Sequence, residues 1–169
     1  MRTIHVLIGN SNLRVTNMIE LLVRSVCDRQ TCLDSTRAPH VEDFLAQAVR
    51  KQFDLIVFNP ENLARSAERP RSFLTIRETE NAIRSIKTLR SAPIVAVCVS
   101  PENEFHLSEA GADLVLGLPF NCDDFKSAVS RLILVPESAT TENAIRPSFA
   151  SGLRRGLEIL TESFGFSRS

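Results

Sequence analysis

The chain has 169 residues, of which 43% are hydrophobic and 24% charged, and its formal net charge at pH 7 is zero. This length allows one ordinary domain with an appendage, and the balanced charge gives no electrostatic reason to expect binding to nucleic acid or to a membrane surface. No apolar run approaches the roughly 20 residues of a membrane span, and no secretory leader precedes the first strand-like segment, so we expect a cytoplasmic protein.

The chain opens with a strand followed by a helix. Residues 4–8 form an apolar run that predicts a strand, and the polar segment 9–12 supplies a turn and helix-cap chemistry. The helix that follows ends near Asp28. This order is typical of the first unit of an α/β fold.

The next unit has the same order but a weaker strand. Residues 31–34 predict an edge strand, and we expect residues 36–40 to form a loop because Pro39 keeps the preceding residue out of a helix. Apolar residues at helical spacing then predict a helix over residues 41–51.

The central strand is predicted at residues 54–58, an apolar run that ends at Asn59. Open α/β folds bind their ligands at the carboxyl ends of the strands, so Asn59 lies where chemistry would be expected. Periodicity weakens over residues 60–75, which predicts a charged surface loop. The cations of this loop and of the start of the next helix include Arg65, Arg69, Arg71 and Arg77. They form either a solvated face or a contact surface for an acidic partner.

The second half of the chain continues the alternation. Its predicted elements are a helix at 78–90, a strand at 93–99, a helix at 102–110 capped by Gly111, a strand at 114–116, and a last helix capped by Asn121. Five strands thus alternate with five helices over about residues 3–135. Such short connections require a parallel sheet with right-handed crossovers, so the predicted fold is doubly wound α/β.

The cysteines and histidines do not form the pattern of a metal centre. Cys27, Cys32, Cys98 and Cys122 include no C-x-x-C pair, and the three histidines are scattered. We expect free thiols in a reducing compartment and no metal, although the spacing leaves a redox pair of Cys27 and Cys32 open.

Three segments, in this order, resemble those of a response-regulator receiver domain. They are residues 54–58 leading to a polar residue, residues 93–97 leading to a small one, and Gly111-Ala112 followed seven residues later by Pro119-Phe120. The resemblance covers nearly the whole (βα)5 unit, residues 1–135. It implies a flavodoxin-like, CheY-like fold and a place in bacterial two-component signalling.

The resemblance also implies which positions would carry phosphoryl transfer. A receiver holds magnesium with acidic residues after the first strand and with its phosphoacceptor Asp, and binds the phosphoryl oxygens with a Thr or Ser and a Lys. The matching positions here are Gly9, Asn10, Asn59, Cys98 and Leu118, with Val115 at the aromatic switch position. Because all have lost the required chemistry, we expect a degenerate pseudo-receiver with no cofactor, no enzymatic activity and no phosphorylation at Asn59.

These residues also have ordinary structural interpretations. Asn10 and Asn59 would satisfy backbone groups of the loops, Gly9 would provide a turn conformation, and Cys98 would be a small buried side chain. An alternative function is a small-molecule sensor that uses the crevice made by Gly9, Asn10, Asn59 and Ser100. An enzyme of another Rossmann-like type is not expected, because the sequence has no G-x-G-x-x-G and no P-loop.

Residues 136–169 are predicted to form a linker and an amphipathic helix. The helix extends from Ser148 to about Phe164, and its apolar stripe comprises Phe149, Leu153, Leu157, Leu160 and Phe164. Gly152 and Gly156 weaken this helix by about 1 kcal/mol each. An apolar stripe has to be covered, and the domain itself, a second copy and a partner protein are the candidates. We favour the second copy or the partner.

The sequence therefore predicts a phosphorylation-independent interaction module that contacts proteins of a signalling pathway, alone or as a homodimer. The contacts would use the arginine-rich loop from Arg65 to Arg77, the fourth helix and fifth strand, or the C-terminal helix. Direct binding to nucleic acid is not expected, because residues 136–169 are too few for a DNA-binding output domain.

Overall fold

The computed structural model describes residues 2–134, without the side chains of residues 69–72 and 134. The predicted linker and C-terminal helix, with Phe149, Leu153, Leu157 and Leu160, lie outside the described residues, and so do the side chains of Arg69 and Arg71.

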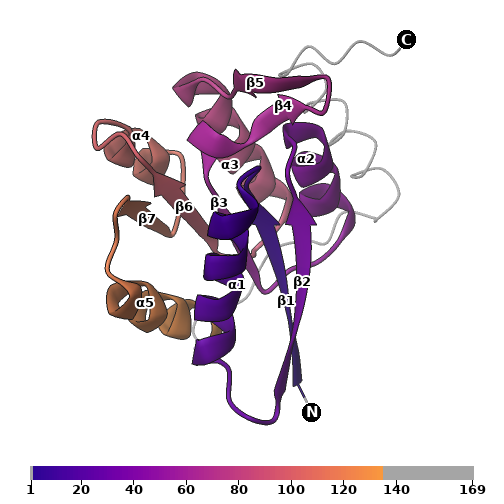
Figure 1. The fold of residues 1–169 in the computed structure, drawn as a ribbon, viewed down its shortest axis with the longest axis vertical. Coiled ribbons are helices and arrows are strands. Elements are labelled where there is room, and N and C mark those ends of the chain that lie inside the picture. Colours follow the sequence, from indigo (N-terminus) through magenta and orange to yellow (C-terminus); the bar gives the residue numbers. More distant parts are fainter. Residues whose placement is uncertain (1, 135–169) are drawn as a thin grey trace, which may run out of the picture.

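A five-stranded sheet forms the centre of the domain (Figure 1). Its strands are β1 (Arg2–Gly9), β2 (Thr31–Ala38), β3 (Leu55–Phe58), β6 (Ile94–Cys98) and β7 (Leu114–Gly117). They pair in the order β2-β1-β3-β6-β7, and every pairing is parallel. The doubly wound fold predicted from the sequence is confirmed, including the edge position of the strand that begins at Thr31.

Helices cover both faces of this sheet. One face carries α1 (Leu13–Val26) and α5 (Cys122–Leu134), and the other carries α2 (Val41–Arg50), α3 (Ile76–Leu89) and α4 (Asn103–Glu109) (Figure 1). Alternate residues of β3 and β6 enter the two apolar cores, and all nine residues of these strands are buried. Burial on both faces explains why the two strands are continuous apolar runs.

Local signals fix the ends of several helices. The side chain of Asn12 accepts hydrogen bonds from the first turn of α1, and Asn121 Oδ1 accepts one from Asp123 N at the start of α5. Gly111 follows α4 with a φ of 104°, a conformation that favours glycine. These caps agree with those predicted at Gly111 and Asn121.

Two segments predicted as loops are partly strands. Residues 36–38 extend β2, because Pro39 excludes helix from the residue before it but is compatible with extended backbone, and β1 pairs with β2 up to Ala38. Residues 60–75 contain a 3-10 turn, η1 (Pro60–Asn62), and an antiparallel hairpin of β4 (Ala64–Ser66) and β5 (Arg69–Phe73). Such short strands carry little periodicity, so the sequence pattern did not predict them.

The four cysteines are free thiols, as expected. Within residues 2–134 the structure contains no helix long and apolar enough to cross a membrane.

Candidate functional site

The carboxyl ends of β1 and β3 bring two asparagines together. Gly9 is paired with Phe58 in the sheet, and the backbone N–H of Asn59 donates to the Gly9 carbonyl at 2.9 Å. Asn10 and Asn59 therefore follow neighbouring strands, and both side chains are buried, with exposed fractions of 4% and 0%. The structure thus places these predicted site residues side by side at the expected edge.

The carbonyl oxygens of both asparagine side chains accept hydrogen bonds from backbone N–H groups. Asn59 Oδ1 accepts hydrogen bonds from the N–H groups of Glu61 at 3.0 Å and Asn62 at 3.2 Å, which caps η1. Asn10 Oδ1 accepts from Asn12 N at 2.7 Å. The Nδ2 atoms of Asn10 and Asn59 are buried and have no hydrogen-bond partner within the part of the chain that the structure describes.

Glu61 also lies at this edge, although no sequence motif indicated it. Its carboxylate accepts hydrogen bonds from Val99 N, from Ser100 N at 3.2 Å and from Asn103 Nδ2 at 2.8 Å. It thereby joins the exit of β3 to the loop between β6 and α4. Its position two residues after Asn59 was the available signal, because it is the first carboxylate to follow β3.

Cys98 ends β6 and is fully buried. Burial, with the carboxylates of Glu104 and Glu61 as smaller contributors, raises the pKa of its thiol to about 11. The thiol is therefore protonated at neutral pH and is a poor nucleophile. This environment fits the interpretation of Cys98 as a small apolar side chain.

Leu118 and Val115 belong to the apolar packing around β7. Leu118 is half-buried against the core on the α1 and α5 side, and its N–H donates to the Cys98 carbonyl at 2.7 Å. Val115 is half-buried against the other core, on the side of α2, α3 and α4. The position that a receiver gives to Lys thus contributes to packing here.

Glycine is needed at position 9 for packing, and not for the turn conformation that we predicted. Its φ lies outside the positive range, and it belongs to β1 rather than to a turn. A Cβ atom at this position would lie 2.6 Å from Phe44 Cδ2 and 3.0 Å from Phe58 Cβ. Glycine is needed here because two aromatic side chains fill the space beside the strand.

The edge does not fit a magnesium ion. Mg²⁺ takes carboxylates and other hard oxygen ligands. Gly9, Asn10 and Asn59 supply no carboxylate, both amide oxygens already accept backbone N–H groups, and Glu61 is engaged with the β6–α4 loop. Among residues 2–134, no cluster of three or more His, Cys, Asp or Glu side chains could hold a metal ion.

The described arginines of the predicted contact surface differ in their surroundings. Arg65 Nη2 lies 2.6 Å from both carboxylate oxygens of Glu78, which ties the hairpin to α3. Although burial opposes it, the hydrogen bonds from Arg65 and Thr75 lower the pKa of Glu78. Arg77 is exposed.

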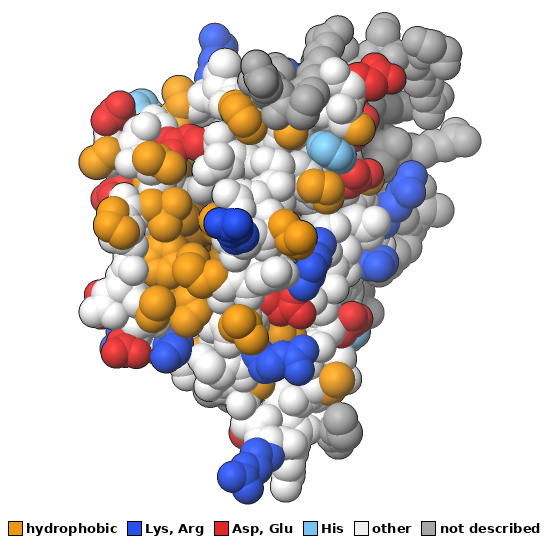
Figure 2. All heavy atoms as spheres, in the orientation of Figure 1, with side chains coloured by type: hydrophobic (Ala, Val, Ile, Leu, Met, Phe, Trp, Pro, Cys, Tyr) orange, Lys and Arg blue, Asp and Glu red, His pale blue; other side chains and the backbone are white. Residues whose placement is uncertain are grey.

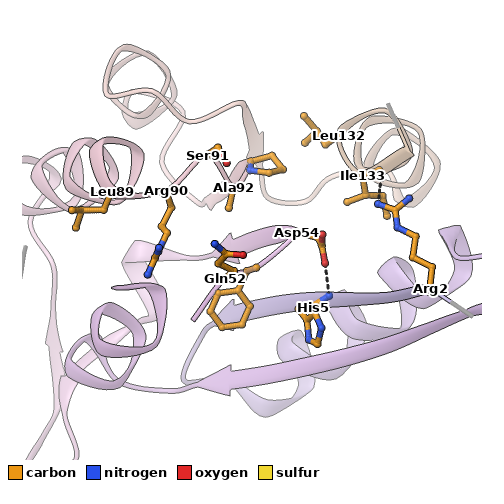
Figure 3. Close-up of a pocket in the computed structure, with 12 residues that line it drawn as sticks. Arg2, His5, Gln52, Asp54, Leu89, Arg90, Ser91, Ala92, Leu132 and Ile133 are labelled. Atoms are coloured by element: carbon orange, nitrogen blue, oxygen red, sulfur yellow. Dashed lines mark hydrogen bonds between the residues drawn. The ribbon is translucent and has the colours of Figure 1, made fainter. Parts of the chain in front are cut away.

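A cavity of about 530 Å³ lies at the opposite edge of the sheet (Figure 3). Arg2 donates there to the Ile133 carbonyl at 3.1 Å and Arg90 to the Val49 carbonyl, while Asp54 accepts from His5 N at 2.8 Å. Both arginines thus donate hydrogen bonds to carbonyls near the C-terminal ends of helices, where a cation is favourable. None of the predicted site residues lines this cavity.

No family profile and no curated protein matches this sequence. Solved structures of receiver domains do match the fold. A signal receiver domain from Clostridium thermocellum superposes with a TM-score of 0.60 at 12% identity, covering 78% of this chain and 98% of its own. A response regulator from Clostridium difficile has a TM-score of 0.59 at 14% identity, with coverages of 80% and 99%.

A third receiver structure shows the contrast at the strand edge. The receiver domain of a sensor histidine kinase from Pseudomonas aeruginosa PAO1 has a TM-score of 0.57 at 17% identity, with coverages of 79% and 99%. That protein has a magnesium ion coordinated in its active-site cleft. The fold of this chain is therefore that of a receiver domain, while its strand edge lacks the ligands that magnesium prefers.

Proposed function

We propose that this protein is a pseudo-receiver that works without phosphorylation, as a protein-interaction module in bacterial two-component-type signalling. It is not an enzyme and uses no cofactor. The observation that carries the proposal is the position of Glu61, whose carboxylate binds the backbone of the β6–α4 loop from within the chain.

The chemistry of phosphoryl transfer supports this function. Phosphorylation needs a carboxylate nucleophile and cations that neutralise the transferred group. Asn59 offers an amide, and its carbonyl oxygen is already bonded to Glu61 N and Asn62 N. The backbone N–H groups of Val99 and Ser100 donate to the carboxylate of Glu61, so a permanent anion occupies the loop that a transient phosphoryl group would need.

The loop held by Glu61 and the helix that follows it each carry a large exposed apolar side chain. Val99 is 51% exposed and Phe105, in α4, is 70% exposed. Large exposed apolar side chains are common at protein contact sites. We therefore place the contact with a partner protein at the β6–α4 loop and α4, with the exposed Arg77 as a second, basic contact.

One observation favours the small-molecule alternative. The Nδ2 atoms of Asn10 and Asn59 are buried donors without a described partner, and an unpaired buried donor is costly. Both side chains are almost inaccessible, so a ligand there would be of the size of water unless the surrounding loops opened.

The proposal is tested by incubating the full chain with Mg²⁺ and acetyl phosphate and measuring its intact mass. The wild type and the Asn59→Asp variant should both remain unmodified. A carboxylate restored at position 59 would still have no acidic metal ligands at Gly9 and Asn10 and no Lys at position 118. A phosphoryl adduct on the wild type would contradict the proposal. An adduct on the Asn59→Asp variant alone would show that the other groups at the strand edge still support phosphoryl transfer.

A further inference from the structure

The outer edge of β2 is open in the part of the chain that the structure describes. Within residues 2–134, β2 pairs only with β1, and the register runs without a shift from its first residue to its last. In Figure 1 this strand forms the outer side of the sheet beside β1. Its 8 residues are many for an edge strand, and such an edge presents a row of unpaired N–H and C=O groups to another chain.

Alternate residues of β2 turn their backbone groups outward. The carbonyl of Ala38 accepts a hydrogen bond from Asn10 N at 3.2 Å, so the even-numbered residues of β2 face β1. The odd-numbered residues Leu33, Ser35 and Arg37 therefore direct their N–H and C=O groups away from the sheet. Within residues 2–134 these groups form no backbone hydrogen bond.

The β2 edge lacks the features that usually prevent pairing with another chain. The strand contains no Pro and no Lys. Its two charged side chains already have partners, since Asp34 binds His5 Nδ1 at 3.0 Å. Arg37 in turn binds Glu20 of α1. In Figure 2 the hydrophobic side chains gather on the opposite side of the molecule, over β7. A contact at β2 would thus be made mainly by backbone hydrogen bonds.

One register of antiparallel pairing between two copies of β2 uses all of the outward groups. With Ser35 opposite its own copy at a two-fold axis, Leu33 lies opposite Arg37 of the second copy. Each of these residue pairs exchanges two N–H···O bonds. A register centred on Arg37 would instead place two guanidinium groups opposite each other, which is unfavourable.

The same register also ends where the donors end. Beyond the pair of Leu33 and Arg37, Thr31 would lie opposite Pro39 of the second copy. Pro39 has no N–H group. The N–H of Thr31 already donates to the Asp28 carbonyl at 3.2 Å. The paired strands would therefore leave no backbone donor without an acceptor at either end.

The adjoining side of α1 favours a whole second domain over an isolated peptide. Glu20 of α1 binds Arg37, so this side of the helix faces the β2 edge. Leu13 lies seven residues before Glu20, on the same side of α1, and is 61% exposed. A second copy would bring its own α1 alongside and cover Leu13, which a single added strand would not.

We propose that two copies of this chain associate through their β2 strands, in antiparallel orientation about a two-fold axis at Ser35. The two sheets then become one continuous sheet. A single strand pair buries less than the roughly 1,200–2,000 Å² of a stable interface, so the dimer is weak and forms at high protein concentration. The proposal goes beyond the pseudo-receiver function and does not depend on it, because it rests on the edge of β2.

Amide–water exchange measured by NMR at increasing protein concentration tests this pairing directly. As the concentration of the full chain rises from tens of micromolar to about one millimolar, exchange at Leu33, Ser35 and Arg37 should slow several-fold. Exchange at Asp34 and Thr36, whose N–H groups face β1, should not change.

Exchange at the three outward amides that does not depend on concentration would overturn the proposal. Fast exchange at every concentration would mean that the edge stays open. Slow exchange at every concentration would place another segment of the same chain on it.

A pair of variants at the two-fold axis provides a second readout. Ser35→Pro removes an N–H group that points away from β1, which an edge strand tolerates, and should abolish self-association in sedimentation velocity. Ser35→Ala keeps this N–H group and should associate like the wild type. A Ser35→Pro protein that associates as strongly as the wild type would contradict the proposal, because another surface would then form the dimer. The exchange experiment uses the wild type alone, so it decides the question even if Ser35→Pro does not fold.

Discussion

The carboxylate of Glu61 accepts a hydrogen bond from the backbone N–H of Val99 and so connects the exit of β3 to the exit of β6. This contact places a carboxylate of the chain itself at the backbone of the β6–α4 loop, and Ser100 N and Asn103 Nδ2 also donate to this carboxylate.

Replacing Glu61 with Gln should loosen this loop. The Gln side chain has the same length but loses the charge, and hydrogen bonds to a charged group contribute about 1.5–3 kcal/mol. We expect the free energy of unfolding to fall by about 1 kcal/mol and the exchange of the Val99 and Ser100 amides to become roughly fivefold faster. Hydrogen exchange monitored by NMR gives the exchange rates of both amides. Glu68→Gln removes the same charge from an exposed residue of the hairpin and should leave them unchanged.

Replacing Gly9 with Ala should destabilise the domain. The new Cβ would meet Phe44 and the Cβ of Phe58, neither of which can move freely in the core. Overpacking of this kind costs about 1–3 kcal/mol. Chemical denaturation measures the loss.

Gly117→Ala is the matched control for this substitution. Its Cβ would lie 2.7 Å from Glu104 Oε1, the end of a flexible and exposed side chain. Because that side chain can swing away, the loss should be less than about 1 kcal/mol. Equal losses for the two variants would contradict the packing explanation for Gly9.

The buried thiol of Cys98 should make stability depend on pH in the alkaline range. Its pKa is raised from 9.0 to about 11 in the folded protein, so the unfolded chain releases this proton first as the pH rises. The contribution to stability is complete below about pH 9 and is lost as the pH rises toward 11. The free energy of unfolding should therefore fall over this window, and the fall should be shallower in Cys98→Ala.

Alkylation provides an independent check on the same thiol. Iodoacetamide at pH 8 should modify the exposed Cys32 and Cys122 first and Cys98 last. Rapid modification of Cys98 in the folded protein would mean that the thiol is accessible and that its pKa is not raised.

The features that were predicted correctly depend on local pattern. The run at residues 94–98 is apolar throughout because both faces of β6 are buried, and Gly111 is required by a positive φ directly after α4. The meeting of Asn10 with Asn59 also follows from the order of strands, since parallel strands end at one edge.

The features that were missed depend on residues far apart in the sequence. Glu61 and Val99 are separated by 38 positions, and no local pattern indicates that one side chain reaches the backbone of the other. Gly9 of β1 is required because of Phe44, which belongs to α2. The short strands of the hairpin are stabilised by pairing with each other and by the bond between Arg65 and Glu78.

Backbone amide NMR of the full chain with Mg²⁺ and beryllofluoride measures whether the strand edge responds to phosphoryl-like anions. For a pseudo-receiver we expect no localised shifts at residues 9–12, 59–62 and 98–100, because the Glu61 carboxylate already binds the β6–α4 loop and the edge offers magnesium no free carboxylate. Saturable shifts confined to Asn59, Cys98 and their neighbours would contradict it.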